Sequence, residues 1–263
     1  MATPRPQHEQ LADQFGGDLL ILHLPQVGST STRLKELIIA GQVTGPTVLV
    51  TNHQTAGRGT RSRSWESGPP EGAGATERAR DLALTFAAPI SGLLDARLSL
   101  AIGAMLAEAI EGCASIPVRV KWPNDICAGD PLRKLGGVLL ETTHGWILVG
   151  VGINVNSQPS DFPDDLAPQL TTLSHELGRS CDVRMLQLAV VRALRHLPDI
   201  DLSAWMTRFH ERDCTSGTRY RLNADGRQLP VVAGTVADDG ALLLHDDDGN
   251  EHRVTSFSEL ERA

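Results

Sequence analysis

Up to about residue 212, short apolar runs typical of strands alternate with longer runs that have helical spacing. The run at 19–24 (LLILHL) and the β-branched run at 47–51 (TVLVT) predict strands. Between them, apolar residues three and four positions apart within 33–40 predict a helix, with hydroxyl caps before it and a glycine after it. This pattern predicts an α/β fold for the larger part of the chain.

The strongest helical pattern lies at 93–113, where apolar side chains form one continuous stripe. Two adjacent strands are predicted at 134–142 and 146–155, with a turn at His144-Gly145. Further strands are predicted at 82–88 and 118–121, and further helices near 170–177, 184–196 and 203–212.

The pattern changes after Thr215, where short β-rich segments follow one another. Asp-Gly pairs at 225–226, 239–240 and 248–249 favour hairpin turns between them. About 50 residues of this kind predict a small five-stranded β-barrel. We therefore expect a larger domain at 1–212, with flexible residues 1–17, and a small β domain at 213–263.

Composition and charge argue against several functional classes, among them nucleic-acid-binding, membrane and secreted proteins. The chain has 263 residues, 24 Lys and Arg against 32 Asp and Glu, and a net charge of −8, which argues against a broad nucleic-acid surface. No apolar run approaches the roughly 20 residues of a membrane helix, and the polar N-terminus lacks a secretory signal. Four cysteines without close spacing indicate free thiols. We expect a cytoplasmic protein that binds neither DNA nor membranes, with a mobile Gly/Pro-rich insertion at 66–80.

The polar segment at 54–65 (QTAGRGTRSRSW) is the first with candidate chemistry. Its glycines let the backbone approach a ligand closely. Its arginines, Arg58, Arg61 and Arg63, can neutralise a carboxylate or a phosphate. A solvated basic loop, or a strip that contacts nucleic acid, fits the same residues.

Three later segments each leave two interpretations open. In 121–125 (KWPND), a lysine lies near an Asn and an Asp that could hold Mg²⁺ with nucleotide phosphates, or the segment could be a surface turn. In 133–141 (RKLGGVLLE), Lys134 could stabilise an oxyanion or phosphate, or mark a solvated strand end. In 150–156 (GVGINVN), asparagines inside an apolar strand indicate specific hydrogen bonds, to a ligand or to neighbouring backbone.

Taken together and in this order, the segments resemble the biotin–protein ligase family. The family motifs GRGRxGRxW, KWPND, KLxGIL(V)E and GxGINVN correspond to GRGTRSRSW (57–65), KWPND (121–125), KLGGVLLE (134–141) and GVGINVN (150–156). The segment GSTST (28–32) is similar to the STN biotin motif of the family. The resemblance covers about residues 18–263. It implies a mixed β-sheet with helices on one side, like class II tRNA-synthetase catalytic cores, plus an SH3-like C-terminal β-barrel.

Members of this family join biotin to ATP, giving biotinyl-5′-AMP and pyrophosphate, and pass the biotinyl group to a carrier lysine. The resemblance implies biotin and ATP as substrates, Mg²⁺ as cofactor, and the biotin carboxyl carrier protein of acetyl-CoA carboxylase as partner. Some members also carry an N-terminal DNA-binding domain. About 18 residues precede the first predicted strand, which is too few for one, so we expect a ligase without repressor activity. Some relatives dimerise when ligand binds, so the resemblance also allows a homodimer.

The resemblance implies the roles of individual residues. The implied catalytic residues are Lys134, Lys121 and Arg58. The implied biotin site comprises Ser29, Thr30, Ser31, Gln54, Arg58, Gly59, Thr60, Lys134 and Gly137. The implied ATP and adenylate site comprises Arg58, Arg61, Arg63, Trp65, Lys121, Asn124 and Asn154, with Asp125, and Asn124 as a second ligand, on Mg²⁺. Core packing stays an alternative for Trp65, and Trp122 is assigned to packing.

The sequence departs from the family motifs at three positions. Thr60 stands where the family has arginine, Ser62 where it has glycine, and Ser31 where it has asparagine. Thr60 removes a cation, and we expect weaker retention of the adenylate unless Arg61 or Arg63 substitutes. Two other functions stay open: a lipoate- or octanoate-transferring relative, and a non-catalytic module that binds a ligand or nucleic acid through the arginine loop.

Overall fold

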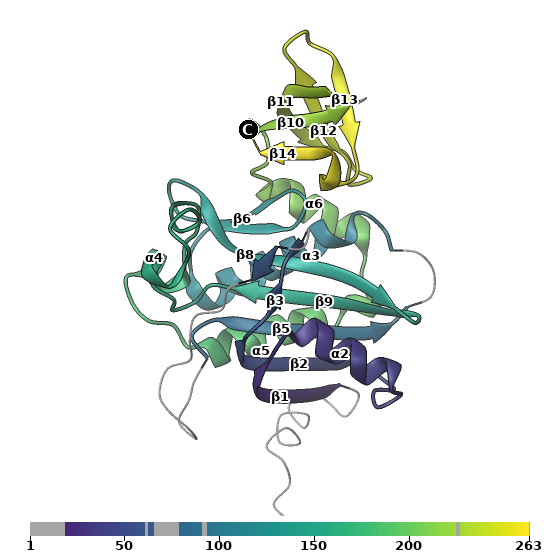
Figure 1. The fold of residues 1–263 in the computed structure, drawn as a ribbon, viewed down its shortest axis with the longest axis vertical. Coiled ribbons are helices and arrows are strands. Elements are labelled where there is room, and N and C mark those ends of the chain that lie inside the picture. The colour runs from purple at the N-terminus through teal and green to yellow at the C-terminus, as the bar shows by residue number, and fades with distance from the viewer. Residues whose placement is uncertain (1–18, 61–62, 66–78, 91–93, 225–226, 263) are drawn as a thin grey trace, which may run out of the picture.

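The computed structural model describes residues 19–60, 63–65, 79–90, 94–224 and 227–262. Its main sheet has the strand order β1-β2-β5-β9-β8-β7-β6 (Figure 1). β1 runs parallel to β2, and the other neighbouring strands are antiparallel, so the sheet is mixed as predicted. The strands are β1 (Leu20–Val27), β2 (Thr47–Gln54), β5 (Leu82–Pro89), β6 (Val118–Lys121), β7 (Asp125–Ala128), β8 (Arg133–Thr143) and β9 (Trp146–Ile153).

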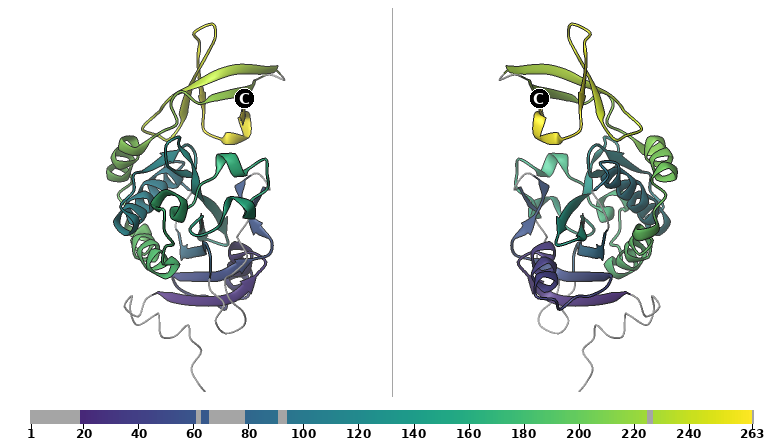
Figure 2. Two further views of the ribbon diagram at one scale, coloured as in Figure 1. Left: turned by 90° about the vertical axis from the view of Figure 1, so that its left-hand side faces the viewer. Right: turned by 90° about the vertical axis from the view of Figure 1, so that its right-hand side faces the viewer.

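Helices cover both faces of this sheet, rather than one face as expected. In β5, Phe86 belongs to the large core that includes α3 and α5, whereas its neighbour Ala87 packs with Leu34 and Ile38 of α2. Successive strand residues point to opposite faces, so α2 lies on the opposite face of the sheet from α3 and α5 (Figure 2). The helices are α2 (Thr30–Ile39), α3 (Leu98–Ala114), α4 (Leu173–Leu177), α5 (Val183–Leu194) and α6 (Leu202–Arg212).

Most predicted elements are present, with differences at short segments. The helix predicted at 93–113 begins only at Leu98, because Asp95 forms a turn that accepts hydrogen bonds from Arg97 and Leu98. The segment at 54–65 holds a small hairpin of β3 (Gly57–Arg58) and β4 (Ser64–Trp65) instead of only a loop. The expected flexible terminus and most of the insertion predicted at 66–80 lie outside the described residues. Within the described ranges, no helix is long and apolar enough to cross a membrane.

The C-terminal strands form a second, antiparallel sheet in the order β13-β12-β11-β10-β14. In the part of the chain that the structure describes, no ladder joins β13 to β14, so hydrogen bonding does not close the predicted barrel. The strands are β10 (Arg219–Ala224), β11 (Arg227–Val236), β12 (Leu242–Asp246), β13 (Glu251–Val254) and β14 (Leu260–Arg262).

Trp122 joins the small sheet to the larger unit, which confirms its assignment to packing. Its side chain is buried, its indole Nε1 donates to the Gly240 carbonyl at 3.0 Å, and its ring lies 5.8 Å from that of Phe257. Its backbone N–H donates to Thr215 Oγ1 at 2.8 Å. The second sheet therefore braces the KWPND segment directly.

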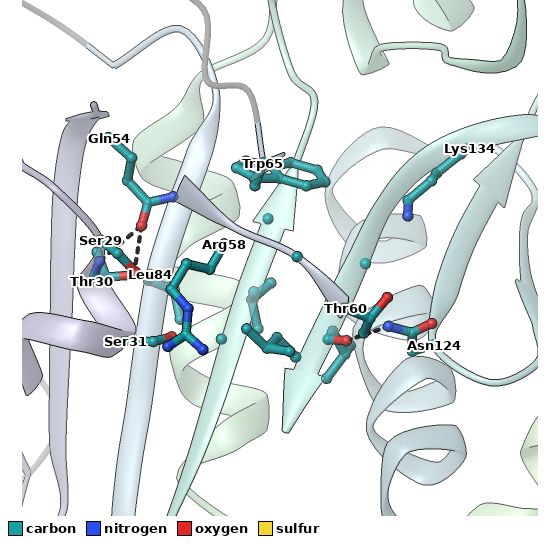
Figure 3. A pocket seen from close by; sticks show the side chains of 17 residues that line it. Ser29, Thr30, Ser31, Gln54, Arg58, Thr60, Trp65, Leu84, Asn124 and Lys134 are labelled. Atoms are coloured by element: carbon teal, nitrogen blue, oxygen red, sulfur yellow. Dashed lines mark hydrogen bonds between the residues drawn. The ribbon is translucent and has the colours of Figure 1, made fainter. Parts of the chain in front are cut away.

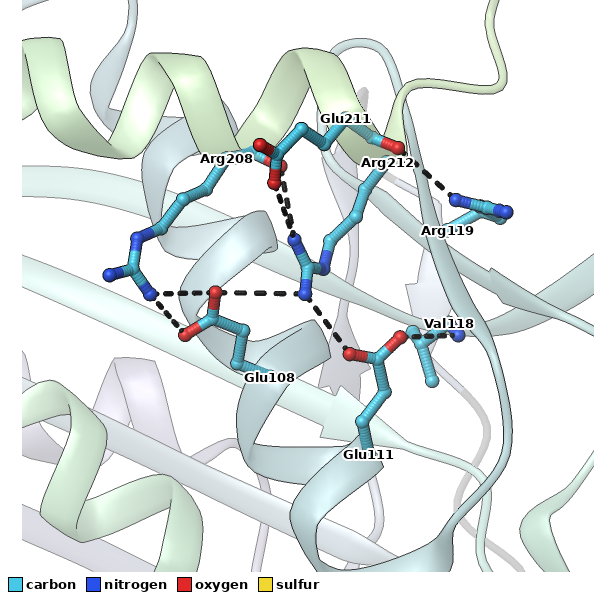
Figure 4. Close-up of polar contacts among 7 residues, drawn as sticks. All are labelled: Glu108, Glu111, Val118, Arg119, Arg208, Glu211 and Arg212. Carbon is cyan, nitrogen blue, oxygen red and sulfur yellow. Dashed lines mark hydrogen bonds and ion pairs between the residues drawn. The ribbon is translucent and has the colours of Figure 1, made fainter.

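A charged cluster fixes the strand that leads into this segment. Arg212 of α6 forms ion pairs with Glu108 and Glu111 of α3 (Figure 4). Glu111 in turn accepts a hydrogen bond from the backbone N–H of Val118, the first residue of β6, at 3.0 Å. Arg208 adds a second pair with Glu108 at 2.7 Å. The two helices and β6 are thus held together at the edge of the main sheet.

Candidate active site

A cavity opens on the face of the sheet that carries α2 (Figure 3). The empty space among its side chains, with the open mouth and the solvent in it included, is about 480 Å³. All nine residues predicted for the biotin site line it. Its lining comprises Ser29, Thr30, Ser31, Gln54, Arg58, Gly59, Thr60, Trp65, Leu84, Asn124, Lys134, Gly137, Val138, Leu139, Gly150, Val151 and Gly152.

The N-terminus of α2 forms one end of the cavity. Ser29 caps the helix, and its hydroxyl accepts a hydrogen bond from the Thr32 N–H at 3.4 Å. Gln54, the last residue of β2, accepts from both the backbone N–H and the hydroxyl of Thr30, at 2.8 and 3.1 Å. Thr30 and Ser31 are buried. This end is therefore a fixed set of polar groups in a mostly apolar wall.

The β3–β4 hairpin forms a second side of the cavity. The Gly59 N–H donates to the Arg63 carbonyl at 2.8 Å, and the Arg63 N–H donates to the Thr60 carbonyl at 3.2 Å. Arg58 pairs with Glu141 at 3.1 Å, and Glu141 also pairs with Lys35 at 2.5 Å. The Arg63 side chain is exposed and does not line the cavity. The predicted adenylate contact of Arg61 lies outside the described residues.

Glycines of β9 make room for this arrangement, and the sequence analysis did not assign them to the site. A Cβ added at Gly152 would lie 2.4 Å from the indole of Trp65, and one at Gly150 would lie 3.0 Å from Ser31 Oγ. The sequence feature that could have indicated a role for these glycines is the Gly-Val-Gly alternation in an otherwise apolar strand. Trp65 both lines the cavity and covers Gly152, and its indole Nε1 has no hydrogen-bond partner among the described residues.

Lys134 reaches the cavity from the start of β8. Its Nζ lies 2.5 Å from Asp125 Oδ1, and the Asp125 carboxylate is almost fully buried. A Cβ added at Gly137 would lie 3.6 Å from the same Nζ, so the glycine keeps the surroundings of the ammonium open. The contact with Asp125 fixes the ammonium of Lys134 at the cavity wall.

The magnesium contact of Asp125 stays a prediction. Its Oδ1 contacts Lys134 Nζ, and the Asn124 amide donates to the Val138 carbonyl at 2.7 Å. In the described ranges, no group of three or more His, Cys, Asp or Glu side chains is placed to hold a metal ion. Mg²⁺ that accompanies nucleotide phosphates is held largely by those phosphates and water, and it would supply charge neutralisation there.

Besides Arg63, two described residues predicted for the ATP site lie outside the cavity lining. Lys121 pairs in register with Asp125 across β6 and β7, and β6 lies two strands from β8, which carries Lys134. Asn154 is buried and donates to the Thr171 carbonyl at 3.1 Å, and its nucleotide contact stays a prediction. Asn156 likewise exchanges hydrogen bonds with the Cys181 backbone. The asparagines of GVGINVN thus satisfy neighbouring backbone, the alternative that the sequence left open.

The cysteines are free, as predicted. Cys127 and Cys214 lie in contact near Lys121. Hydrogen bonding to Cys214, together with burial, raises the pKa of the Cys127 thiol. Hydrogen bonding to Cys127 lowers the pKa of Cys214, and the charge of Lys121 adds to that effect.

Comparison with known proteins decides the family. Residues 24–157 match the model of the biotin/lipoate A/B protein ligase family. The chain belongs to this family. The bifunctional ligase/repressor BirA of Bacillus subtilis is 30% identical over 259 residues, which cover 95% of this chain and 76% of that protein. The biotin–[acetyl-CoA-carboxylase] ligase of Mycobacterium tuberculosis is 28% identical over 255 residues, covering 91% and 88% of the two chains.

A solved ligase structure supports the same assignment. The biotin protein ligase from Aquifex aeolicus in complex with biotin and ATP is 26% identical in sequence, and the two structures superpose with a TM-score of 0.72. The match covers 92% of this chain and 99% of that ligase. The predicted family and the predicted mixed α/β class are therefore confirmed.

Proposed function

We propose that this chain is an ATP-dependent biotin protein ligase. It joins biotin to ATP, releases pyrophosphate, and transfers the biotinyl group from biotinyl-5′-AMP to a lysine of a carrier domain. One observation carries the proposal: side chains from separate stretches of the sequence, each predicted to bind biotin, line a single cavity. The relatives named above support biotin as the substrate. We propose biotin carboxyl carrier protein as the carrier and, from the free thiols, a reducing cytoplasmic location.

The end of the cavity at α2 fits the bicyclic ring of biotin. Biotin carries a polar ureido group on an apolar ring system, so its site needs hydrogen-bonding groups within an apolar wall. Ser29, Thr30 and Ser31 supply hydroxyls, and the helix N-terminus adds a partial positive charge that favours the ureido oxygen. Val138 and Leu139 of β8 contribute apolar lining.

The other end fits the carboxylate and the nucleotide. Figure 3 shows Lys134 across the cavity from the serine and threonine hydroxyls. A carboxylate oxygen of biotin attacks the α-phosphorus of ATP, a new phosphorus–oxygen bond forms, and the bond to the leaving pyrophosphate breaks. Negative charge builds during this step, and an ammonium held in place by Asp125 stabilises it. Arg58 is half-exposed, and it can exchange Glu141 for a phosphate when the hairpin closes.

The second step needs no nucleophile from this chain. The amine of the carrier lysine attacks the acyl carbon of the mixed anhydride, an amide bond forms, and AMP leaves with the electrons of the cleaved bond. The chain holds the adenylate and excludes water until the carrier arrives. Trp65 and the β3–β4 hairpin lie where they can cover it.

Lipoate and octanoate fit the cavity less well. Neither carries a ureido group that could hydrogen-bond with the hydroxyls at the start of α2, and the absence of those bonds lowers the binding free energy. The nucleic-acid alternative is opposed by the net charge of −8 and by the pairing of Arg58 with Glu141.

The test is labelling of a purified biotin carboxyl carrier domain, measured as the intact mass of the carrier. With ATP and biotin, we expect one biotinyl mass increment. We expect none without ATP, and none on a carrier whose acceptor lysine is replaced by arginine. Labelling with lipoate but not with biotin would contradict the proposal.

A further inference from the structure

A buried threonine lies behind the polar end of the cavity. Thr85 is in β5, an interior strand of the main sheet, is fully buried, and does not line the cavity itself. Its Oγ1 lies 2.8 Å from Thr30 Oγ1 and 3.0 Å from Ser31 Oγ. Thr30 Oγ1 in turn lies 3.1 Å from Gln54 Oε1. Three hydroxyls and one amide therefore form a continuous hydrogen-bonded chain.

The direction of this chain follows from counting protons. The backbone N–H of Thr30 can only donate, so the amide atom that faces it at 2.8 Å is the oxygen of Gln54. That oxygen carries no proton, so the Thr30 hydroxyl donates to it. The Thr85 hydroxyl then donates to Thr30, and the Ser31 hydroxyl donates to Thr85. Any other arrangement leaves two oxygens in contact without a proton between them.

We propose that Thr85 is a positioning residue that sets the hydrogen-bonding polarity of the biotin site; this inference rests on the proposed function. Because Ser31 gives its proton to Thr85, its oxygen presents only lone pairs to the cavity. It therefore accepts a hydrogen bond and pairs with an N–H group of the ureido ring. The hydrogen-bonded chain makes the site select a ligand with an N–H donor at this end.

The surroundings of Thr85 separate this role from ordinary strand packing. The neighbouring positions of β5 on the same face are Ala83 and Ala87, so the strand is otherwise apolar there. Among the residues that the structure describes, the Thr85 side chain hydrogen-bonds to two residues of the cavity wall, Thr30 and Ser31. Thr47 of β2 is a similarly buried threonine, but its hydroxyl donates to the Gly45 carbonyl, away from the cavity. Thr47 therefore provides a matched control.

The experiment measures the dissociation constant of biotin by calorimetry for the wild type, Thr85→Val, Thr85→Ser and Thr47→Val. Valine keeps the shape of threonine and removes the hydroxyl, so we expect roughly tenfold or greater weakening of biotin binding. Serine restores the hydroxyl, and we expect wild-type affinity within about twofold. Thr47→Val should match Thr85→Val in thermal stability while binding biotin like the wild type. The KM for ATP should not change in any variant.

Two further measurements make the result specific. Desthiobiotin keeps the ureido group and lacks the sulfur ring, so Thr85→Val should weaken it by the same factor as biotin. Ser31→Ala removes the end of the hydrogen-bonded chain, and adding Thr85→Val to it should cost little more, because the two residues act together. Biotin affinity of Thr85→Val within twofold of the wild type, or fully additive losses, would overturn this inference and leave the ligase function intact. A wild type that binds no biotin would instead overturn the proposed function.

Discussion

The substitution Gly152→Ala tests how the cavity is built. Gly152 lies in β9 directly beneath the Trp65 indole, and its added methyl group would lie 2.4, 2.5 and 2.9 Å from three carbons of that ring. Carbon atoms pack at about 3.5–4.0 Å, so the ring must move by about 1 Å. Trp65 pairs with Gly57 in the β3–β4 hairpin. The shift of the ring therefore also displaces Arg58 and the other hairpin residues predicted to bind biotin, Gly59 and Thr60.

A displacement of about 1 Å at a catalytic site can cost on the order of 100-fold in rate. We therefore expect kcat/KM for biotin to fall by about that factor in a biotin-dependent pyrophosphate-release assay. The fold itself should hold, because alanine has a smaller backbone entropy cost than glycine in a strand and the hairpin can absorb the shift. The thermal midpoint should change by only a few degrees.

Gly112→Ala is the matched control. A methyl group added at this position in α3 meets no atom of the described residues within 4 Å, so activity should be unchanged, and stability should rise by about 0.5–1 kcal/mol. If Gly152→Ala keeps wild-type kcat and KM, the contact between Trp65 and β9 plays no part in forming the functional site.

Three other substitutions test separate parts of the account. Asp125→Asn removes the negative partner of Lys134, and we expect kcat to fall 10-fold or more, on the order of the effect of one lost electrostatic contact, with little change in biotin affinity. An unchanged kcat would contradict the role of Asp125 as the partner of Lys134. Thr60→Arg restores a cation in the hairpin, and the dissociation rate of biotinyl-5′-AMP, followed by stopped flow, should fall; an equal rate would refute the expected weak retention. Trp122→Phe deletes the hydrogen bond to the Gly240 carbonyl and should lower the free energy of unfolding by about 1–3 kcal/mol, measured by thermal denaturation. An unchanged thermal midpoint would show that this contact does not stabilise the packing of the second sheet.

Long periodic segments could be predicted from the sequence because the regular spacing of their apolar residues indicates one buried face. The hairpin of β8 and β9 is an example: apolar runs flank His144 and Gly145, and both residues adopt positive φ angles in the structure, as tight hairpin turns require. The strand β7 was missed because four residues after a proline are too few to show a period. The start of α3 was misplaced because the turn at Asp95 depends on one local hydrogen bond rather than on hydropathy.

The predicted biotin residues lie around one cavity because they belong to segments with a recognisable order along the chain. The partners within each segment could not be predicted. Asn154 is polar in an apolar strand, which indicates a hydrogen bond, but only the fold shows that the acceptor is the Thr171 carbonyl. The pairing of Asp125 with Lys134 depends on the register between β7 and β8, which the sequence does not specify. The space that Gly150 and Gly152 provide depends on side chains from distant segments.

The central claim is that the ammonium of Lys134 activates biotin on ATP in this cavity. It is tested most directly by biotin-dependent exchange of radiolabelled pyrophosphate into ATP, measured for the wild type and Lys134→Ala at saturating substrates. We expect exchange by the wild type only when biotin is present, and a loss of about 100-fold or more in the variant. Exchange by Lys134→Ala at a rate near that of the wild type would contradict the claim.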